Sequence, residues 1–397
     1  MAGGARAQEV RISPTLRPLS GSERVYLAAA QVSPPFANQL VVEGEGSLAP
    51  AALAEALRLA GEALPETRGR LRGALGWTRW VDSGEAPRVR VVDGAGWDGL
   101  GPAPFLDAPL DPWRGQVAEV LVVEGTPQRL VFRSLHAAAD GVGTRTWMDL
   151  VFRALRGEAL EGGALDRTDA AWVRGWPVAP RPDQALARRL FEPRGPSTWS
   201  RVRLDGHRGG PLAALLGELA REAGTPALLD VPMDLRPDLA VGPVFGNLTG
   251  LARLVVSEPG EVPALLTRAR ADRVGAGFPR DGERVRALPL ALLRAGVRGG
   301  AEGPLSTTAT VSNLGRVEPG AWSCEGFRAT RFFSIPPAAP GLQLWLTLAG
   351  TGPALDLVGR ARLPREALER RLAGWAAAVA RGDKRGEKGG TPQGRPP

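Results

Sequence analysis

His136 is the residue of this sequence best suited to do chemistry. It is one of two histidines in the 397 residues, and it ends an apolar run in the stretch FRSLHAAADGVG, residues 132–143. An unperturbed imidazole titrates near pH ~6.5, so it can take a proton from a hydroxyl or an amine at neutral pH. The alanines at 137–139 leave space beside the ring for a substrate. This pattern indicates either a general base or a buried structural histidine.

Asp140 stands four residues after His136, where the sequence predicts that a helix begins near Gly141. A short acceptor side chain at such a position caps the first turn of a helix. A buried carboxylate also needs a cationic partner such as arginine. We therefore expect Asp140 to begin the helix and to pair with an arginine.

The other histidine and the single cysteine give weaker signals. His207 lies in the turn RLDGHRGG, which is typical of an exposed loop. Cys324 would need a histidine within hydrogen-bond reach to act as a nucleophile, and a lone cysteine is more often a small buried residue. One cysteine excludes an internal disulfide and a metal site built from cysteines. We predict no bound metal.

Gly94, Gly96 and Gly99 have the spacing of a dinucleotide-binding fingerprint and follow a predicted strand. Such a fingerprint requires a helix directly after it, because the pyrophosphate binds at the helix N-terminus. The sequence continues PAPFLDAPLDPW, which contains too many prolines for a helix. The glycines therefore indicate a loop.

Charge and hydropathy argue against two classes of partner. The formal net charge is +8, and residues 381–397 alone carry five basic and two acidic side chains. Most other arginines alternate with acidic residues, as on a solvated surface, so we expect no nucleic-acid partner. No apolar run approaches the ~18 residues of a membrane span, and the N-terminus lacks the apolar core of a secretory signal. We expect a cytoplasmic protein that does not bind a membrane.

Hydrophobic periodicity predicts a mixed chain of strands and helices. Strands are expected at 38–46, 88–94, 116–125, 128–136, 198–206, 227–235, 247–256, 306–313, 341–350 and 354–363. Helices are expected at 48–64, 141–158, 211–224 and 364–381. The strands at 116–125 and 128–136 should form a hairpin, because a short Gly-Thr-Pro turn joins them.

The same pattern divides the chain into two lobes. Residues 1–175 form the first lobe, and residues 176–197, rich in proline and arginine, form a segment that crosses to the second. Residues 198–381 form the second lobe. We expect residues 382–397 to be a disordered tail.

His136, Asp140 and Gly141 together form the motif His-x-x-x-Asp-Gly. This motif resembles the active-site motif of the chloramphenicol acetyltransferase-like superfamily, which includes the condensation domains of nonribosomal peptide synthetases and the plant HxxxD acyltransferases. Further stretches are similar to the same superfamily in the same order, so that the resemblance covers residues 16–380. They lie at 18–29, 38–75, 231–250 and 308–317, and include MDLRP, GNLTG and VSNLG.

The resemblance implies a mixed α/β (α+β) fold of two chloramphenicol acetyltransferase-like lobes, each a mixed sheet flanked by helices. The lobes would form a pseudo-dimer with a channel between them and His136 at its middle. It also implies acyl transfer from an acyl-CoA or a phosphopantetheinyl carrier protein to a small-molecule amine or alcohol. The thioester would be a co-substrate, and no cofactor would stay bound.

The resemblance also implies roles for single residues. His136 would act as general base on the nucleophile. Asp140 would be structural and pair with an arginine, for which Arg236 is the first choice and Arg253 the second. Gly141 would keep the channel open for the donor arm.

Three further residues are expected on the channel. Ser312 and Asn313 would lie close to it, where a hydroxyl or an amide could stabilise the tetrahedral oxyanion. Trp147, in the helix that follows Gly141, is expected on the channel wall.

The sequence departs from the superfamily at several points. Condensation domains usually carry two adjacent histidines, and the first is Leu135 here. The DFGWG motif of the plant enzymes is absent, so we do not expect a member of the plant branch. A carrier-protein domain is also absent, so we expect a free-standing enzyme. We further expect a monomer that acts in specialised metabolism. Two alternatives remain: a cyclisation or another condensation on the same scaffold, and a non-catalytic docking module for a carrier protein.

Overall fold

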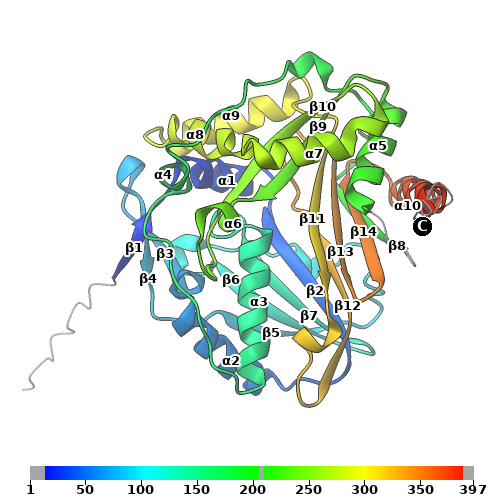
Figure 1. Cartoon of the computed structure of the whole chain (residues 1–397). Coiled ribbons are helices and arrows are strands. Elements are labelled where there is room, and N and C mark those ends of the chain that lie inside the picture. The colour runs from blue at the N-terminus through cyan, green and yellow to red at the C-terminus, as the bar shows by residue number, and fades with distance from the viewer. Residues whose placement is uncertain (1–13, 205–209, 388–397) are drawn as a thin grey trace, which may run out of the picture.

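The computed structural model describes residues 14–204 and 210–387. They form two lobes, each a sheet with helices packed against it, and a small third sheet beside the first lobe (Figure 1). The small sheet contains β1 (Thr15–Pro18), β3 (Gly69–Arg72) and β4 (Arg79–Asp82). The predicted mixed α/β architecture of two lobes is confirmed.

The sheet of the first lobe has five strands in the order β12, β2, β7, β6, β5. β6 and β7 form the predicted antiparallel hairpin, and β5 pairs in parallel with β6. One face packs against α2 (Pro50–Ala63) and α3 (Gly141–Leu155) to form the core of this lobe. The strands are β2 (Ala37–Gly46), β5 (Arg88–Asp93), β6 (Ala118–Glu124), β7 (Gln128–Leu135) and β12 (Phe327–Ile335).

The sheet of the second lobe has six strands in the order β10, β9, β11, β13, β14, β8. Leu229, Val311 and Leu346 face a core that is covered by three helices, and the residues that alternate with them face the first lobe. The strands are β8 (Thr198–Leu204), β9 (Ala227–Asp234), β10 (Thr249–Val256), β11 (Ala309–Val317), β13 (Leu344–Thr351) and β14 (Ala354–Ala361). The helices are α5 (Pro211–Ala223), α7 (Val262–Ala271) and α10 (Arg365–Glu387).

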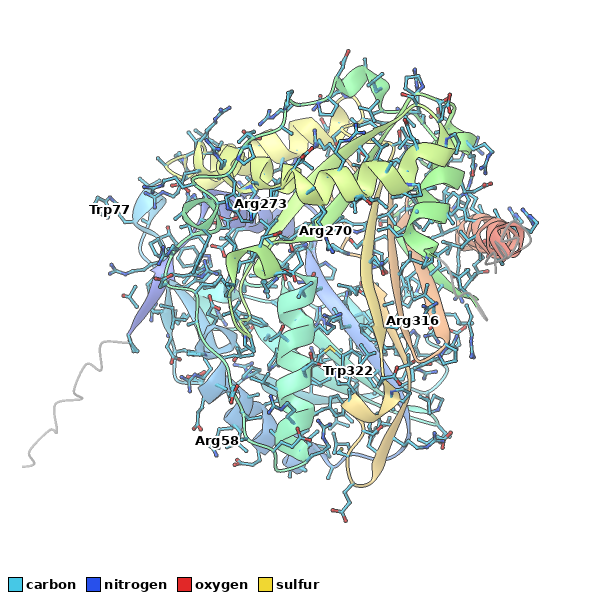
Figure 2. The ribbon with its side chains drawn as sticks, viewed as in Figure 1. Arg58, Trp77, Arg270, Arg273, Arg316 and Trp322 are labelled. Atoms are coloured by element: carbon cyan, nitrogen blue, oxygen red, sulfur yellow. The ribbon has the colours of Figure 1, made fainter. Side chains whose placement is uncertain are left out.

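β12 belongs to the second lobe by sequence and to the first lobe by pairing. It lies antiparallel to β2, although β11 and β13 on either side of it in sequence stay in the second sheet. Phe332 of β12 packs edge-on against Trp322, which lies beside α3 in the first-lobe core (Figure 2). β12 thus lies within residues 198–381, the segment predicted as the second lobe, while its apolar side chains are buried in the core of the first lobe.

Three helices that pack together join the two lobes (Figure 1). α1 (Gly21–Val32) packs against α8 (Gly277–Glu283) and α9 (Leu290–Glu302). A Cβ atom on Gly21 would lie 1.8 Å from the carbonyl oxygen of Gly282, so this close approach of two backbones requires glycine. Two single-turn helices, α4 (Asp169–Trp172) and α6 (Arg236–Leu239), lie on the connections.

The last helix is longer than predicted. α10 continues to Glu387, so the prediction of a disordered tail is wrong for residues 382–387, and residues 388–397 lie outside the described residues. Across the described part of the chain, no helix has both the length and the apolar character needed to cross a membrane.

Candidate functional site

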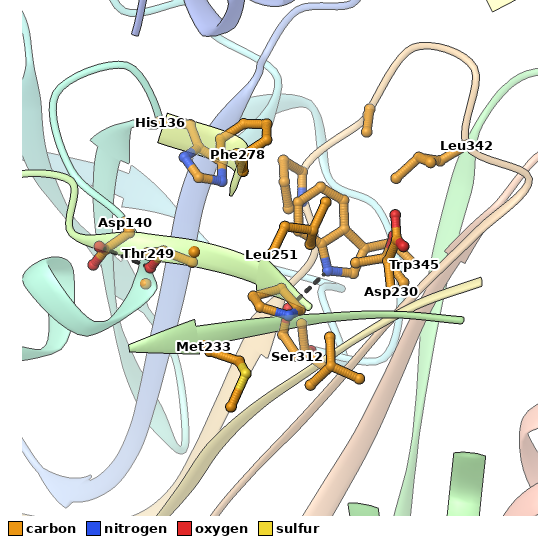
Figure 3. Close-up of a pocket in the computed structure, with 18 of the residues that line it drawn as sticks. His136, Asp140, Asp230, Met233, Thr249, Leu251, Phe278, Ser312, Leu342 and Trp345 are labelled. Carbon is orange, nitrogen blue, oxygen red and sulfur yellow. Dashed lines mark hydrogen bonds between the residues drawn. The ribbon is translucent and has the colours of Figure 1, made fainter. Parts of the chain in front are cut away.

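A cavity of ≈ 770 Å³ lies between the two lobes, and its wall is mostly apolar. The first lobe contributes the end of β7 and the start of α3, and the second lobe contributes the inner face of its sheet. Several of the lining side chains are drawn in Figure 3. Those used below are Tyr26, Phe36, His136, Asp140, Gly141, Asp230, Asp234, Arg253, Ser312, Asn313 and Trp345.

The backbone of His136 is held by both lobes. β7 ends at Leu135, and the N–H of His136 then donates to the carbonyl oxygen of Phe36 at 3.2 Å. From the second lobe, the side-chain amide of Asn247 donates to the carbonyl oxygens of His136 and Ala137, at 3.0 and 3.1 Å. Asn247 therefore fixes the position of His136 across the interface. This asparagine belongs to the stretch GNLTG, and its residue type alone does not predict the contact.

Aromatic rings enclose the imidazole of His136. The ring of Tyr26 lies 4.5 Å from it between centroids, that of Phe36 stacks on it at 5.1 Å, and that of Trp345 lies at 6.2 Å. The residue is only 7% exposed, and its Nδ1 has no hydrogen-bond partner among the described residues. Burial lowers the pKa of His136, and this effect outweighs the opposing effects of a backbone hydrogen bond and of the charge of Asp140. The imidazole is therefore neutral at neutral pH and able to accept a proton.

Asp140 caps α3, as the sequence predicted. Its Oδ1 accepts from the N–H of Gly143 at 2.7 Å, and its Oδ2 accepts from the N–H of Leu248 and the hydroxyl of Thr249, both at 2.8 Å. The guanidinium of Arg236 donates to both oxygens, at 3.1 and 3.2 Å. Burial alone would raise the pKa of Asp140, but Arg236 and the N–H donors lower it below its usual range. Asp140 is thus a buried, ionised anchor between the lobes.

Arg236, the first choice from the sequence, is the arginine that pairs with Asp140. It also donates to the carbonyl oxygen of Gly246 at 2.6 Å and to Asp234 at 2.9 Å. Arg253, the second choice, lies elsewhere and faces Asp230 at 3.6 Å.

Two glycines set how closely the start of α3 approaches the second lobe. A Cβ on Gly141, which lines the cavity, would lie 3.1 Å from the side chain of Leu314. A Cβ on Gly143 would lie 1.9 Å from the carbonyl oxygen of Phe245, a backbone atom that cannot turn aside. Gly141 is the glycine predicted to keep the channel open, but the tighter steric requirement is at Gly143.

Ser312 and Asn313 both line the cavity, whereas Trp147 does not. The hydroxyl oxygen of Ser312 accepts from the indole N–H of Trp345 at 3.0 Å, and the side-chain oxygen of Asn313 accepts from the N–H of Gly315 at 3.0 Å. Trp147 is fully buried in the first-lobe core. Its predicted place on the channel wall is wrong because it lies on the apolar face of α3.

Of the weaker candidates from the sequence, Cys324 lies apart from this site. Cys324 is half-buried and is not among the residues that line the cavity. Burial raises the pKa of its thiol. His207 lies outside the described residues.

Solved structures with the same fold were found, whereas no protein-family model and no curated protein matches the chain. The first condensation domain of the calcium-dependent antibiotic synthetase, in complex with a substrate analogue, matches with a TM-score of 0.67 and 16% identity, over 93% of this chain and 96% of that one. Polyketide synthase associated protein 5 from Mycobacterium tuberculosis matches with a TM-score of 0.63 and 16% identity, over 92% and 98%.

A third structure is a mutant starter condensation domain of rhizomide synthetase in complex with C8-CoA and Leu-SNAC. It matches with a TM-score of 0.58 and 15% identity, over 95% of this chain and 97% of that one. These matches extend over both lobes and the cavity between them. The chain therefore has the two-lobed, chloramphenicol acetyltransferase-like fold of the condensation domains.

Proposed function

We propose that this protein is a condensation-type acyltransferase that moves an acyl group from a CoA or carrier-protein thioester to an amine or hydroxyl acceptor, with His136 as general base. The observation that carries the proposal is the buried imidazole of His136 on the wall of a cavity to which both lobes contribute. A group that must take a proton at neutral pH has to be unprotonated beforehand. Burial keeps His136 in that form.

The proposed reaction is a direct transfer. The nucleophilic nitrogen or oxygen attacks the thioester carbonyl, and its proton passes to the ring nitrogen of His136 that faces the cavity. A C–N or C–O bond forms, the C–S bond breaks, and the sulfur leaves as a thiol with the proton that His136 releases. The hydroxyl of Ser312 accepts from Trp345 and so keeps its own proton free to donate to an oxyanion.

The surroundings of His136 suit such a step. Its backbone is fixed by Phe36 and Asn247, and Asp140 ties the following helix to the second lobe. These contacts hold a base in one place, which a reaction between two bound substrates requires. The similar starter condensation domain was solved with C8-CoA and Leu-SNAC, which supports a thioester donor and an amine acceptor.

The test is turnover by the wild type and by His136→Ala, with a panel of acyl-CoA and carrier-protein thioesters, a panel of amines and alcohols, and mass spectrometry of the products. We expect His136→Ala to lose a factor of about 10²–10⁴ in kcat/KM. Cys324→Ser, a substitution away from the cavity, is the matched control and should retain wild-type turnover.

Two results would contradict the proposal. Turnover that survives in His136→Ala would remove the role of general base. Binding of a carrier protein without any turnover by the wild type would favour the non-catalytic docking module.

A further inference from the structure

Asp230 is a buried carboxylate on the wall of the same cavity, and the proposed acyl transfer does not use it. Its side chain is only 4% exposed, and its Oδ1 has no hydrogen-bond partner among the described residues. The ion-pair partner that the structure gives it is Arg253, whose Nε lies 3.6 Å from Oδ1, beyond hydrogen-bond distance. A buried carboxylate without such a bond is costly for the fold. A ligand that supplied the missing partner would remove that cost.

The sheet register points Asp230 into the cavity. It pairs with Arg253 on β10 and with Thr310 on β11, and Thr310 pairs with Trp345 on β13. Residues directly opposite each other on neighbouring strands share a face, so these four form one row. All four line the cavity. The strand neighbours of Asp230, Leu229 and Val231, face the opposite core.

Asp230 lies away from the reacting centre. Figure 3 shows Asp230 apart from His136. A group bound at Asp230 is therefore a remote part of a substrate and not the atom that attacks or is attacked.

We propose that Asp230 binds a cationic nitrogen, such as a protonated amine, carried by one of the two substrates at a position remote from its reacting atom. This inference rests on the proposed acyl transfer and adds a substrate class to it. An ammonium or guanidinium supplies the carboxylate of Asp230 with a charge-assisted hydrogen bond, which Arg253 at 3.6 Å does not.

The ionisation of Asp230 agrees with this. Burial raises its pKa to about 7, against the opposing effect of Arg253. A cation bound beside the carboxylate would return it to the ionised form. The other acidic group on the same strand and cavity wall, Asp234, already has Arg236 at 2.9 Å. Asp230 is thus the acidic residue of this strand that still lacks a close cationic partner.

The test compares substrates of equal length that differ only in charge. For the acceptor, the pair is 1,6-diaminohexane and 6-amino-1-hexanol; for the donor, it is 8-aminooctanoyl-CoA and 8-hydroxyoctanoyl-CoA. We expect the wild type to prefer the cationic member of one pair in kcat/KM, and Asp230→Asn to reduce that ratio at least about tenfold. If the preference is seen with the acceptor pair, the acceptor carries the cation; if it is seen with the donor pair, the acyl donor carries it.

Asp234→Asn is the matched control, the same substitution on the same strand at a carboxylate that is already paired. It should leave the ratio of the two members unchanged, whatever it does to their separate rates. Asp230→Asn should fold and melt at the wild-type temperature or above, because it removes a buried charge that lacks a hydrogen bond. The inference would be overturned if the wild type preferred the cationic member in neither the acceptor pair nor the donor pair. It would also be overturned if Asp230→Asn kept the wild-type preference.

Calorimetry separates this inference from the proposed reaction. If no thioester is turned over, the proposed acyl transfer fails, yet wild-type protein should still bind the cationic member of one pair more tightly than its hydroxyl counterpart. Asp230→Asn should bind both members alike. Equal binding of both members by the wild type would overturn the inference by itself.

Discussion

The ion pair between Asp140 and Arg236 should stabilise the join between the lobes by a measurable amount. Oδ1 of Asp140 accepts from Gly143 and Arg236, and Oδ2 accepts from Leu248, Thr249 and Arg236. Asp140→Asn replaces one oxygen by an NH₂ group, so at least two buried donors lose their acceptor in either orientation of the amide. Each orphaned donor costs about 1–3 kcal/mol, so we expect a loss of about 2–6 kcal/mol.

Arg236→Ala tests the same pair from the other side. It leaves the carboxylates of Asp140 and Asp234 without their guanidinium, and breaking a buried pair in this way costs about 3–5 kcal/mol. Either loss is a large part of the roughly 5–15 kcal/mol by which proteins are stable. Urea unfolding followed by tryptophan fluorescence measures it. Arg328→Ala, which breaks an exposed pair with Glu45, is the control and should cost less than about 0.5 kcal/mol.

The pH dependence gives a second check on this pair. The folded pKa of Asp140 is lowered, so its stabilisation is present above the unfolded pKa of ~4 and is lost as the pH falls through the lower folded value. The difference between wild type and Asp140→Asn should therefore shrink in acid. If Asp140→Asn and Arg236→Ala both unfold within about 0.5 kcal/mol of wild type, the structural role is refuted.

Three further predictions concern sterics and protonation. Gly143→Ala should lower the urea midpoint by the equivalent of about 1–3 kcal/mol or more, and Gly141→Ala by less, because the first meets backbone and the second a side chain that can turn. The pH profile of kcat/KM should rise through an apparent pKa below ~6.5 and stay flat to neutrality, since burial keeps His136 unprotonated; a rise centred above 7 would contradict this. Burial, with the charge of Glu23, raises the pKa of Asp169 to about 7, so its ionisation destabilises the fold as the pH rises from ~4 to 7. Asp169→Asn should therefore raise the melting temperature at pH 7 more than at pH 4, and an equal effect at both values would count against a neutral Asp169.

Local periodicity was enough to predict β7 and α3, and so to place His136 at the end of a strand and Asp140 at the start of a helix. It also contained the signal that Trp147 is buried, because Trp147, Leu150 and Val151 repeat at helical spacing. The channel assignment for Trp147 went against that pattern. α1 carries a capping box between Ser20 and Glu23, a signal that could have predicted this helix.

Contacts between distant segments could not be predicted in this way. Asn247 donates to the backbone of His136 across the interface, and Asp230 lines the same cavity as His136. Neither relation can be recognised from the hydrophobic periodicity of the sequence. The stretch FRATRFFSI, residues 327–335, has strand character, but nothing local specifies β2 as its partner. The partner of a strand depends on which side chains its two faces bury against the rest of the protein. For β12 these side chains come from both lobes, so the local sequence does not specify the pairing.

The crossing of β12 has a consequence for how the protein is made on the ribosome. The edge of β2 that β12 covers has no partner until synthesis has proceeded about 280 residues further, as the separation of Glu45 and Arg328 shows. At roughly 5–20 residues per second this takes on the order of 15–60 s. During that interval an apolar strand edge is open to pairing with other chains. A nascent chain that stops before residue 327 is therefore expected to aggregate. The first lobe cannot complete its sheet until β12 of the second half of the chain has been synthesised.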